Sequence, residues 1–182
     1  EDFYFIHKII ALGNFTELKS AAVIPSPRIS DRVPFGTGKA IGDWIETGNQ
    51  TYDTYAFKSF EVIKAFVAIA PKLRTLNLDA AGIMLDKADK ELLKRFLAEQ
   101  KFDEALAEVR SNAKTPEAFL KRFFRWFDAF KILKIVHFFR DNGIENAPIF
   151  GETNKLLSIL NPTVSVVNER DQLVFLREFE KK

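Results

Sequence analysis

One stretch of the chain, residues 115–141, combines seven phenylalanines and a tryptophan with six basic residues. Thr115 can cap a helix, and Pro116 suits the first helical position, where no backbone N–H is needed. Asn142 and Gly143 form a typical left-handed helix stop. A continuous helix over this stretch would be roughly 40 Å long, enough to cross a small domain. We therefore expect one long, Phe-rich helix near the centre of the fold.

The two halves of this stretch carry their apolar residues on different sides. In the first half the aromatic residues share one broad face, and Lys121, Arg122 and Arg125 lie opposite. In the second half Ile135 and Phe139 fall on the side that was charged earlier. A helix that is apolar nearly all round is buried by its neighbours, so we interpret the stretch mainly as core.

The basic face of Lys121, Arg122 and Arg125 leaves a second interpretation open, namely contact with a membrane surface, an acidic partner or a nucleic acid. A helix that lies on a membrane keeps one polar face to its end, and this stretch does not. A membrane surface is therefore disfavoured, although the sequence does not exclude it.

Length and composition predict a single domain with a substantial core. The chain has 182 residues, of which 47% are hydrophobic, and its 19 phenylalanines against three tyrosines are mostly packing material without a polar handle. We expect one soluble, mainly α-helical domain over 1–182, a compact bundle of about five to seven helices. Asp86 is a further expected helix cap, ahead of an antiparallel helix pair near 92–109.

Near the C-terminus two structures compete. Asn168 followed by Asp171 indicates a helix cap, with a helix through Phe179. Alternatively, residues 164–167 and 173–176 could pair as a short β-hairpin. We favour the helix and keep the hairpin as the alternative.

Charge and cysteine content exclude several classes of function. The 27 basic and 25 acidic residues leave a net charge of only +2, which does not indicate a nucleic-acid-binding protein. Because the chain has no cysteine, disulfides, thiol nucleophiles and cysteine-ligated metals are excluded. The two histidines, His7 and His137, lack the Glu-x-x-His spacing of a helical di-iron site. The sequence thus predicts no metal or cofactor, and it does not predict a compartment.

The segment 24–50 is irregular, with three of the seven prolines and four of the eight glycines. Only Lys39–Glu46 offers a helical turn or two. Long irregular runs inside compact domains are often functional. This run carries residue types that are enriched at binding hot spots or able to anchor one, so it is our candidate partner-binding segment. These residues are Arg28, Arg32, Phe35, Lys39 and Trp44.

Two other interpretations of this segment are open. Phe35 and Trp44 could simply pack the loop onto the core. Gly36 and Gly38 before Lys39 resemble the end of a phosphate-binding loop only superficially, because Ala40 stands where Ser or Thr is required. An ordinary loop is therefore the better interpretation of the glycines.

No catalytic constellation is apparent in the sequence, which leaves enzymatic activity undecided and disfavoured. We expect a non-enzymatic structural or adaptor module that binds another protein, or itself, within a larger assembly. The alternative is a helical pocket for a lipid or another apolar small molecule, because 19 phenylalanines can line a cavity as well as fill one. An enzyme built from scattered charged residues is the third option.

Overall fold

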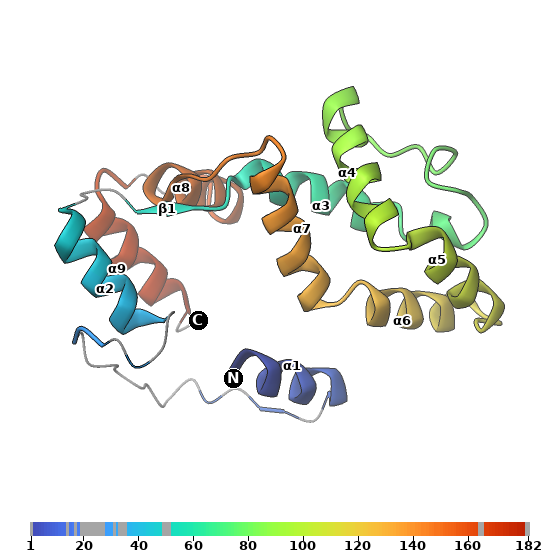
Figure 1. Cartoon of the computed structure of the whole chain (residues 1–182), viewed down its shortest axis with the longest axis horizontal. Coiled ribbons are helices and arrows are strands. Elements are labelled where there is room, and N and C mark those ends of the chain that lie inside the picture. The colour runs from blue at the N-terminus through green and yellow to red at the C-terminus, as the bar shows by residue number, and fades with distance from the viewer. Residues whose placement is uncertain are drawn as a thin grey trace. The chain divides into compact units, whose positions relative to one another are not determined.

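The computed structural model describes residues 2–13, 15–16, 18, 28–30, 32, 36–48, 52–163 and 166–180. These residues form nine α-helices and one two-stranded antiparallel sheet, so the expected mainly α-helical fold is confirmed (Figure 1). The chain divides into two compact units, one of residues 53–164 and one of residues 1–52 with 165–182. The expectation of a single domain stays a prediction.

The larger unit, residues 53–164, contains six of the described helices, a 3₁₀ turn and the sheet. Its helices are α3 (Phe57–Ala68), α4 (Lys87–Glu99), α5 (Phe102–Ser111), α6 (Pro116–Trp126), α7 (Ala129–Asp141) and α8 (Ile149–Leu160), and its 3₁₀ turn is η1 (Lys72–Arg74). The sheet pairs β1 (Asp53–Thr54) with β2 (Ala147–Pro148), with Asp53 opposite Pro148 and Thr54 opposite Ala147.

Helix α3 organises the core of this unit. It packs against α7 and α8, while α4 packs against α5 and α7, and α5 packs against α6. Phe66 on α3 is fully buried, and its ring centroid lies 5.8 Å from that of Phe102, 5.9 Å from Phe123 and 5.1 Å from Phe127. Such aromatic clusters contribute both buried area and favourable edge-to-face contacts. The phenylalanines around Phe66 therefore fill this core.

The expected continuous helix over 115–141 is wrong, because the stretch forms two helices, α6 and α7 (Figure 1). Phe127 leaves the helical conformation with ψ of 68°, and the Asp128 carboxylate accepts a hydrogen bond from the Lys131 backbone N–H at 2.9 Å. Asp128 is thus the N-cap of α7. The shift of the apolar face between the two halves reflects this change of direction, which lets both helices bury their apolar sides.

Three further helix ends in the larger unit follow local signals in the sequence. The Thr115 hydroxyl accepts a hydrogen bond from the Ala118 N–H at 3.2 Å, and the Asp86 carboxylate accepts one from the Asp89 N–H at 2.9 Å. Helix α7 stops at Asn142, and Gly143 follows with φ of 123°. These caps satisfy backbone groups that have no partner inside the helix.

A buried carboxylate joins α8 to the start of α3. Glu152 is 8% exposed, and it accepts hydrogen bonds from the backbone N–H of Phe57 and from the Lys155 ammonium, the latter at 2.6 Å. Burial alone would raise the pKa of Glu152, but the hydrogen bonds from Lys155 and Phe57 outweigh it and hold that pKa below its ordinary value. Glu152 therefore serves as the N-terminal anion that α3 lacks within its own sequence.

The smaller unit contains α1 (Asp2–Leu12), α2 (Thr37–Thr47) and α9 (Glu169–Glu180). Helix α2 shows that the segment 24–50 is less irregular than expected, because the helix extends past both ends of Lys39–Glu46. Helix α9 confirms the helix expected near the C-terminus, and the alternative hairpin there is wrong: residues 173–176 are helical. None of the described helices is both long and apolar enough to span a membrane.

Candidate functional site

Helix α2 has a glycine side that a neighbouring segment covers. Gly38 and Gly42 lie one turn apart, and the Ser30 N–H donates a hydrogen bond to the Gly38 carbonyl at 3.4 Å. A Cβ atom at Gly38 would lie 2.6 Å from the Ser30 Cβ, and one at Gly42 would lie 3.2 Å from the Ile29 Cγ2. The two glycines thus allow residues 28–30 to approach the α2 backbone closely.

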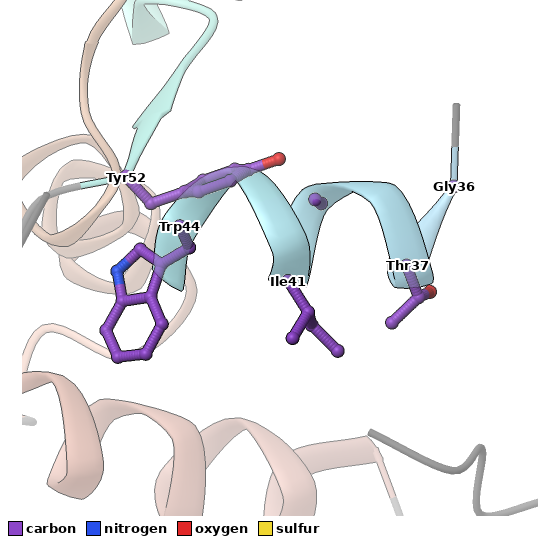
Figure 2. A pocket seen from close by; sticks show the side chains of 6 residues that line it. Gly36, Thr37, Ile41, Trp44 and Tyr52 are labelled. Atoms are coloured by element: carbon purple, nitrogen blue, oxygen red, sulfur yellow. The ribbon is translucent and has the colours of Figure 1, made fainter. Parts of the chain in front are cut away.

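The opposite side of α2 forms an open apolar hollow of about 510 Å³. We call its lining residues the α2 surface: Gly36, Thr37, Ala40, Ile41, Trp44 and Tyr52. Figure 2 shows the Thr37, Ile41 and Trp44 side chains on the same side of α2, with Tyr52 alongside the helix. Trp44 is 53% exposed and Tyr52 is 57% exposed. Two large aromatic side chains therefore lie beside a concave apolar surface.

The residues predicted to bind a partner differ in their exposure and in their contacts. Arg28, Arg32 and Trp44 are exposed. The Lys39 ammonium pairs with the Asp43 carboxylate at 2.6 Å, one turn along α2, so its charge is already matched. Phe35 lies outside the described residues.

Ile41 and Tyr52 line the same hollow as Trp44, although the sequence did not indicate them as binding residues. The spacing of Thr37, Ile41 and Trp44 on a helix was the available signal, because residues three and four apart share one face.

The predicted basic face is present on α6 and is exposed. Lys121, Arg122 and Arg125 project from the side of α6 opposite Phe119 and Phe123, which are buried in the core. We call these three cationic residues the α6 surface. In the part of the chain that the structure describes, none of the three charged groups forms a hydrogen bond or ion pair. Their charges are therefore available to an external anion.

Two hollows adjoin the α6 surface. The first, about 200 Å³, lies between α5 and α6 and is lined by both arginines with Ala105, Glu108, Val109, Asn112 and Trp126. The second, about 260 Å³, is lined by Ala118, Lys121, Arg122 and Arg125. Arg122 and Arg125 thus line both hollows. The α5 residues of the first hollow reach α6 through tertiary packing, which the sequence did not predict.

Further cations lie at the start of α7. The Lys131 ammonium is 4.7 Å from the centre of the Trp126 ring, and that of Lys134 is 4.8 Å from the Phe130 ring, both in cation–π geometry. Burial lowers the pKa of Lys131, and the nearby Lys134 lowers it further, against the opposing effect of Asp128. Burial beside the Trp126 ring is thus the main reason why the pKa of Lys131 lies below its ordinary value.

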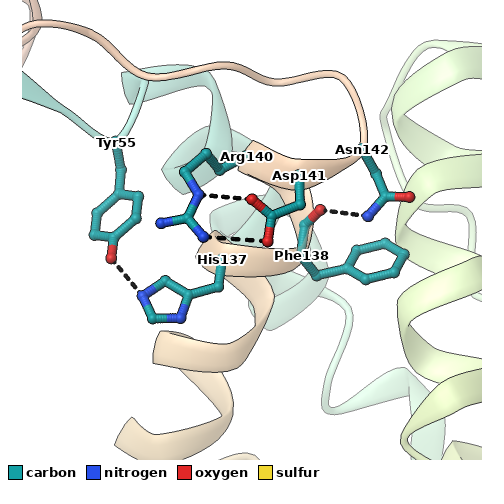
Figure 3. A network of polar contacts seen from close by, with 6 residues as sticks. All are labelled: Tyr55, His137, Phe138, Arg140, Asp141 and Asn142. Carbon is teal, nitrogen blue, oxygen red and sulfur yellow. Dashed lines mark hydrogen bonds and ion pairs between the residues drawn. The ribbon is translucent and has the colours of Figure 1, made fainter.

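Tyr55 and His137 form a polar contact between residues far apart in the sequence. The His137 Nε2 and the Tyr55 hydroxyl form a hydrogen bond of 2.6 Å (Figure 3). Arg140 lies nearby and forms a bidentate contact with Asp141, which holds the pKa of that carboxyl below its ordinary value. Neither Tyr55 nor His137 lines any of the hollows described above. His137 is thus a partly buried histidine with a hydrogen-bond partner in the larger unit.

Two further observations limit the chemistry. Among the described residues, no group of three or more Asp, Glu or His is arranged to hold a metal ion. Comparison with known proteins finds no matching family model, and neither a curated protein nor a solved structure is significantly similar to the chain. The α2 surface and the α6 surface are therefore the candidate binding sites among the described residues.

Proposed function

We propose that this protein is a non-enzymatic module that binds another protein, within a larger assembly, through the α2 surface. The observation that carries the proposal is the pair of half-exposed aromatic side chains, Trp44 and Tyr52, beside an apolar hollow of about 510 Å³. Tryptophan and tyrosine are enriched among residues that dominate binding energy at protein interfaces. Exposed apolar groups rimmed by polar residues commonly mark such interfaces.

The arrangement of α2 supports this role. Because Gly38 and Gly42 are covered by residues 28–30, the helix keeps its aromatic side available. Arg28 and Arg32 supply exposed guanidinium groups on the neighbouring segment. Arginine at the edge of an apolar contact can add hydrogen bonds and partner selectivity.

Affinity capture from a native lysate tests the proposal. The wild-type chain, the Arg32→Ala/Trp44→Ala variant and the Phe60→Ala variant would be used side by side. Phe60 is a matched control, because it is an exposed aromatic residue on α3 and does not line the α2 hollow. We expect a stoichiometric protein partner with the wild type and with Phe60→Ala, and its loss with Arg32→Ala/Trp44→Ala. Recovery of the same proteins by all three chains would contradict the proposal.

The alternative function, binding of an apolar small molecule, draws on the same hollow. The hollow is open to solvent, but its walls include the apolar side chains of Ile41, Trp44 and Tyr52, which an apolar molecule could contact. Mass spectrometry of the purified wild-type chain distinguishes the two functions. A small molecule that co-purifies with the wild type, and is lost with Trp44→Ala, would favour this alternative.

A further inference from the structure

We propose that the α6 surface is a second binding site, which accepts an acidic peptide segment of a partner protein. This inference goes beyond the α2 surface and stands whether or not α2 binds anything, because it depends on different residues in a different unit of the chain. Two observations support it. Lys121, Arg122 and Arg125 are exposed and have no partner in the described structure, and two hollows adjoin them.

The position of the arginines favours carboxylate recognition. Arg122 and Arg125 line both hollows, so an anion in either hollow meets at least two guanidinium groups. The planar guanidinium donates two parallel hydrogen bonds to a carboxylate, and this geometry gives both strength and orientation. Lys121 adds a third positive charge to the second hollow.

The first hollow also has an apolar part. Ala105, Val109 and Trp126 line it beside the two arginines, and Trp126 is half-buried against Phe102 and Phe123. A ligand that fits this lining carries an apolar side chain next to its carboxylates. A peptide segment that mixes acidic and apolar residues has this chemistry.

The surrounding acids favour a peptide over a nucleic acid. Glu108 lines the first hollow, and Glu117 precedes Lys121 by one turn of α6. A continuous phosphate backbone would pass one or both carboxylates, whereas a peptide can place single carboxylates at the arginines alone. The net charge of +2 likewise does not indicate a surface for extended phosphate contacts.

A fluorescein-labelled peptide in which glutamate alternates with leucine tests the proposal by fluorescence anisotropy with the full chain. We expect the Arg122→Gln/Arg125→Gln variant to weaken binding by about tenfold or more, because hydrogen bonds to charged groups are lost. The Lys64→Gln/Lys87→Gln variant is the control, because it changes the net charge equally at exposed positions that line neither hollow. It should bind nearly as the wild type does.

Two further arms keep the proposal falsifiable if the arginine variant folds poorly. Glu108→Gln should tighten binding of the peptide, because it removes a repulsive carboxylate from the first hollow. A peptide with glutamine in place of glutamate should not bind. The proposal is overturned if the acidic peptide fails to bind, if it binds both double variants equally, or if a single-stranded oligonucleotide of equal charge binds more tightly than the peptide.

Discussion

The α6 surface and the α2 surface differ in what holds each helix in place. Helix α6 inserts Phe119 and Phe123 into the core and begins with the Thr115 cap. Helix α2 has no side-chain cap, and among its described residues only Gly42 is buried. Local stability follows the buried apolar contacts of a segment. We therefore expect α6 to be locally more stable than α2, and if α2 binds a protein as proposed, α2 should gain more order on binding than α6.

The largest effect should come from removing the core under the α6 surface. Phe66→Ala deletes a fully buried ring that contacts three other aromatic residues, and it should lower the free energy of unfolding by about 3–5 kcal/mol. Phe60→Ala on the same helix is the control, and its effect should stay within about 0.5 kcal/mol because Phe60 is exposed. Chemical denaturation measures both. If the two variants lost similar amounts of unfolding free energy, Phe66 would not be the buried core residue on which the stability of α6 depends.

A smaller effect is expected at the buried anion of the larger unit. Glu152→Ala leaves the Phe57 N–H without its acceptor and should cost about 1–3 kcal/mol. The pKa of Glu152 is lower in the folded chain than in the unfolded chain. The ionised carboxylate therefore stabilises the fold, fully so at pH values above the unfolded pKa, and this stabilisation is lost as the pH falls through the folded pKa.

Glu152→Gln is the matched control for this pH dependence, because it keeps an acceptor and removes the charge. Denaturation curves recorded at falling pH should show a steeper loss of stability for the wild type than for Glu152→Gln. Equal slopes for the two chains would mean that Glu152 does not contribute through its charge.

The smallest effect should appear at α2 and should separate its two glycines. Gly38→Ala forces the new Cβ against the Ser30 backbone and side chain, which should lower the local stability of α2 by about 1–3 kcal/mol. The better helix propensity of alanine offsets up to about 1 kcal/mol of this loss. Gly42→Ala meets only the Ile29 side-chain methyl, so it should be close to neutral. Local hydrogen exchange of α2 measures both. Equal responses would contradict the close approach of residues 28–30.

The sequence predicted the helical class and the helix ends that carry a capping residue, because caps are local. Thr115, Asp86 and Asn142 each act within a few residues, so their signals could be recognised directly. The cap at Asp128 was missed because the apolar content of 115–141 favoured a single helix. The rotation of the apolar face within that stretch was the sign of the break.

The candidate sites were less predictable, because their walls come from tertiary contacts. Trp44 was predicted from its residue type within an irregular segment, and Arg122 and Arg125 were predicted from their position on one helix face. The contributions of Tyr52 to the α2 surface, and of α5 to the first hollow, depend on how separate segments pack. The contact of Glu152 with Phe57 spans 95 positions in the chain and leaves no local pattern.

The measurement that tests the central claim most directly is hydrogen exchange of the full chain, with and without the partner recovered by affinity capture. For the free chain, we expect fast exchange in α2 and slow exchange in α6. With the partner bound, α2 should gain the largest protection, and this gain should disappear with Trp44→Ala. If α2 exchanges equally fast with and without the partner while other helices become protected, then the α2 surface is not the site of binding.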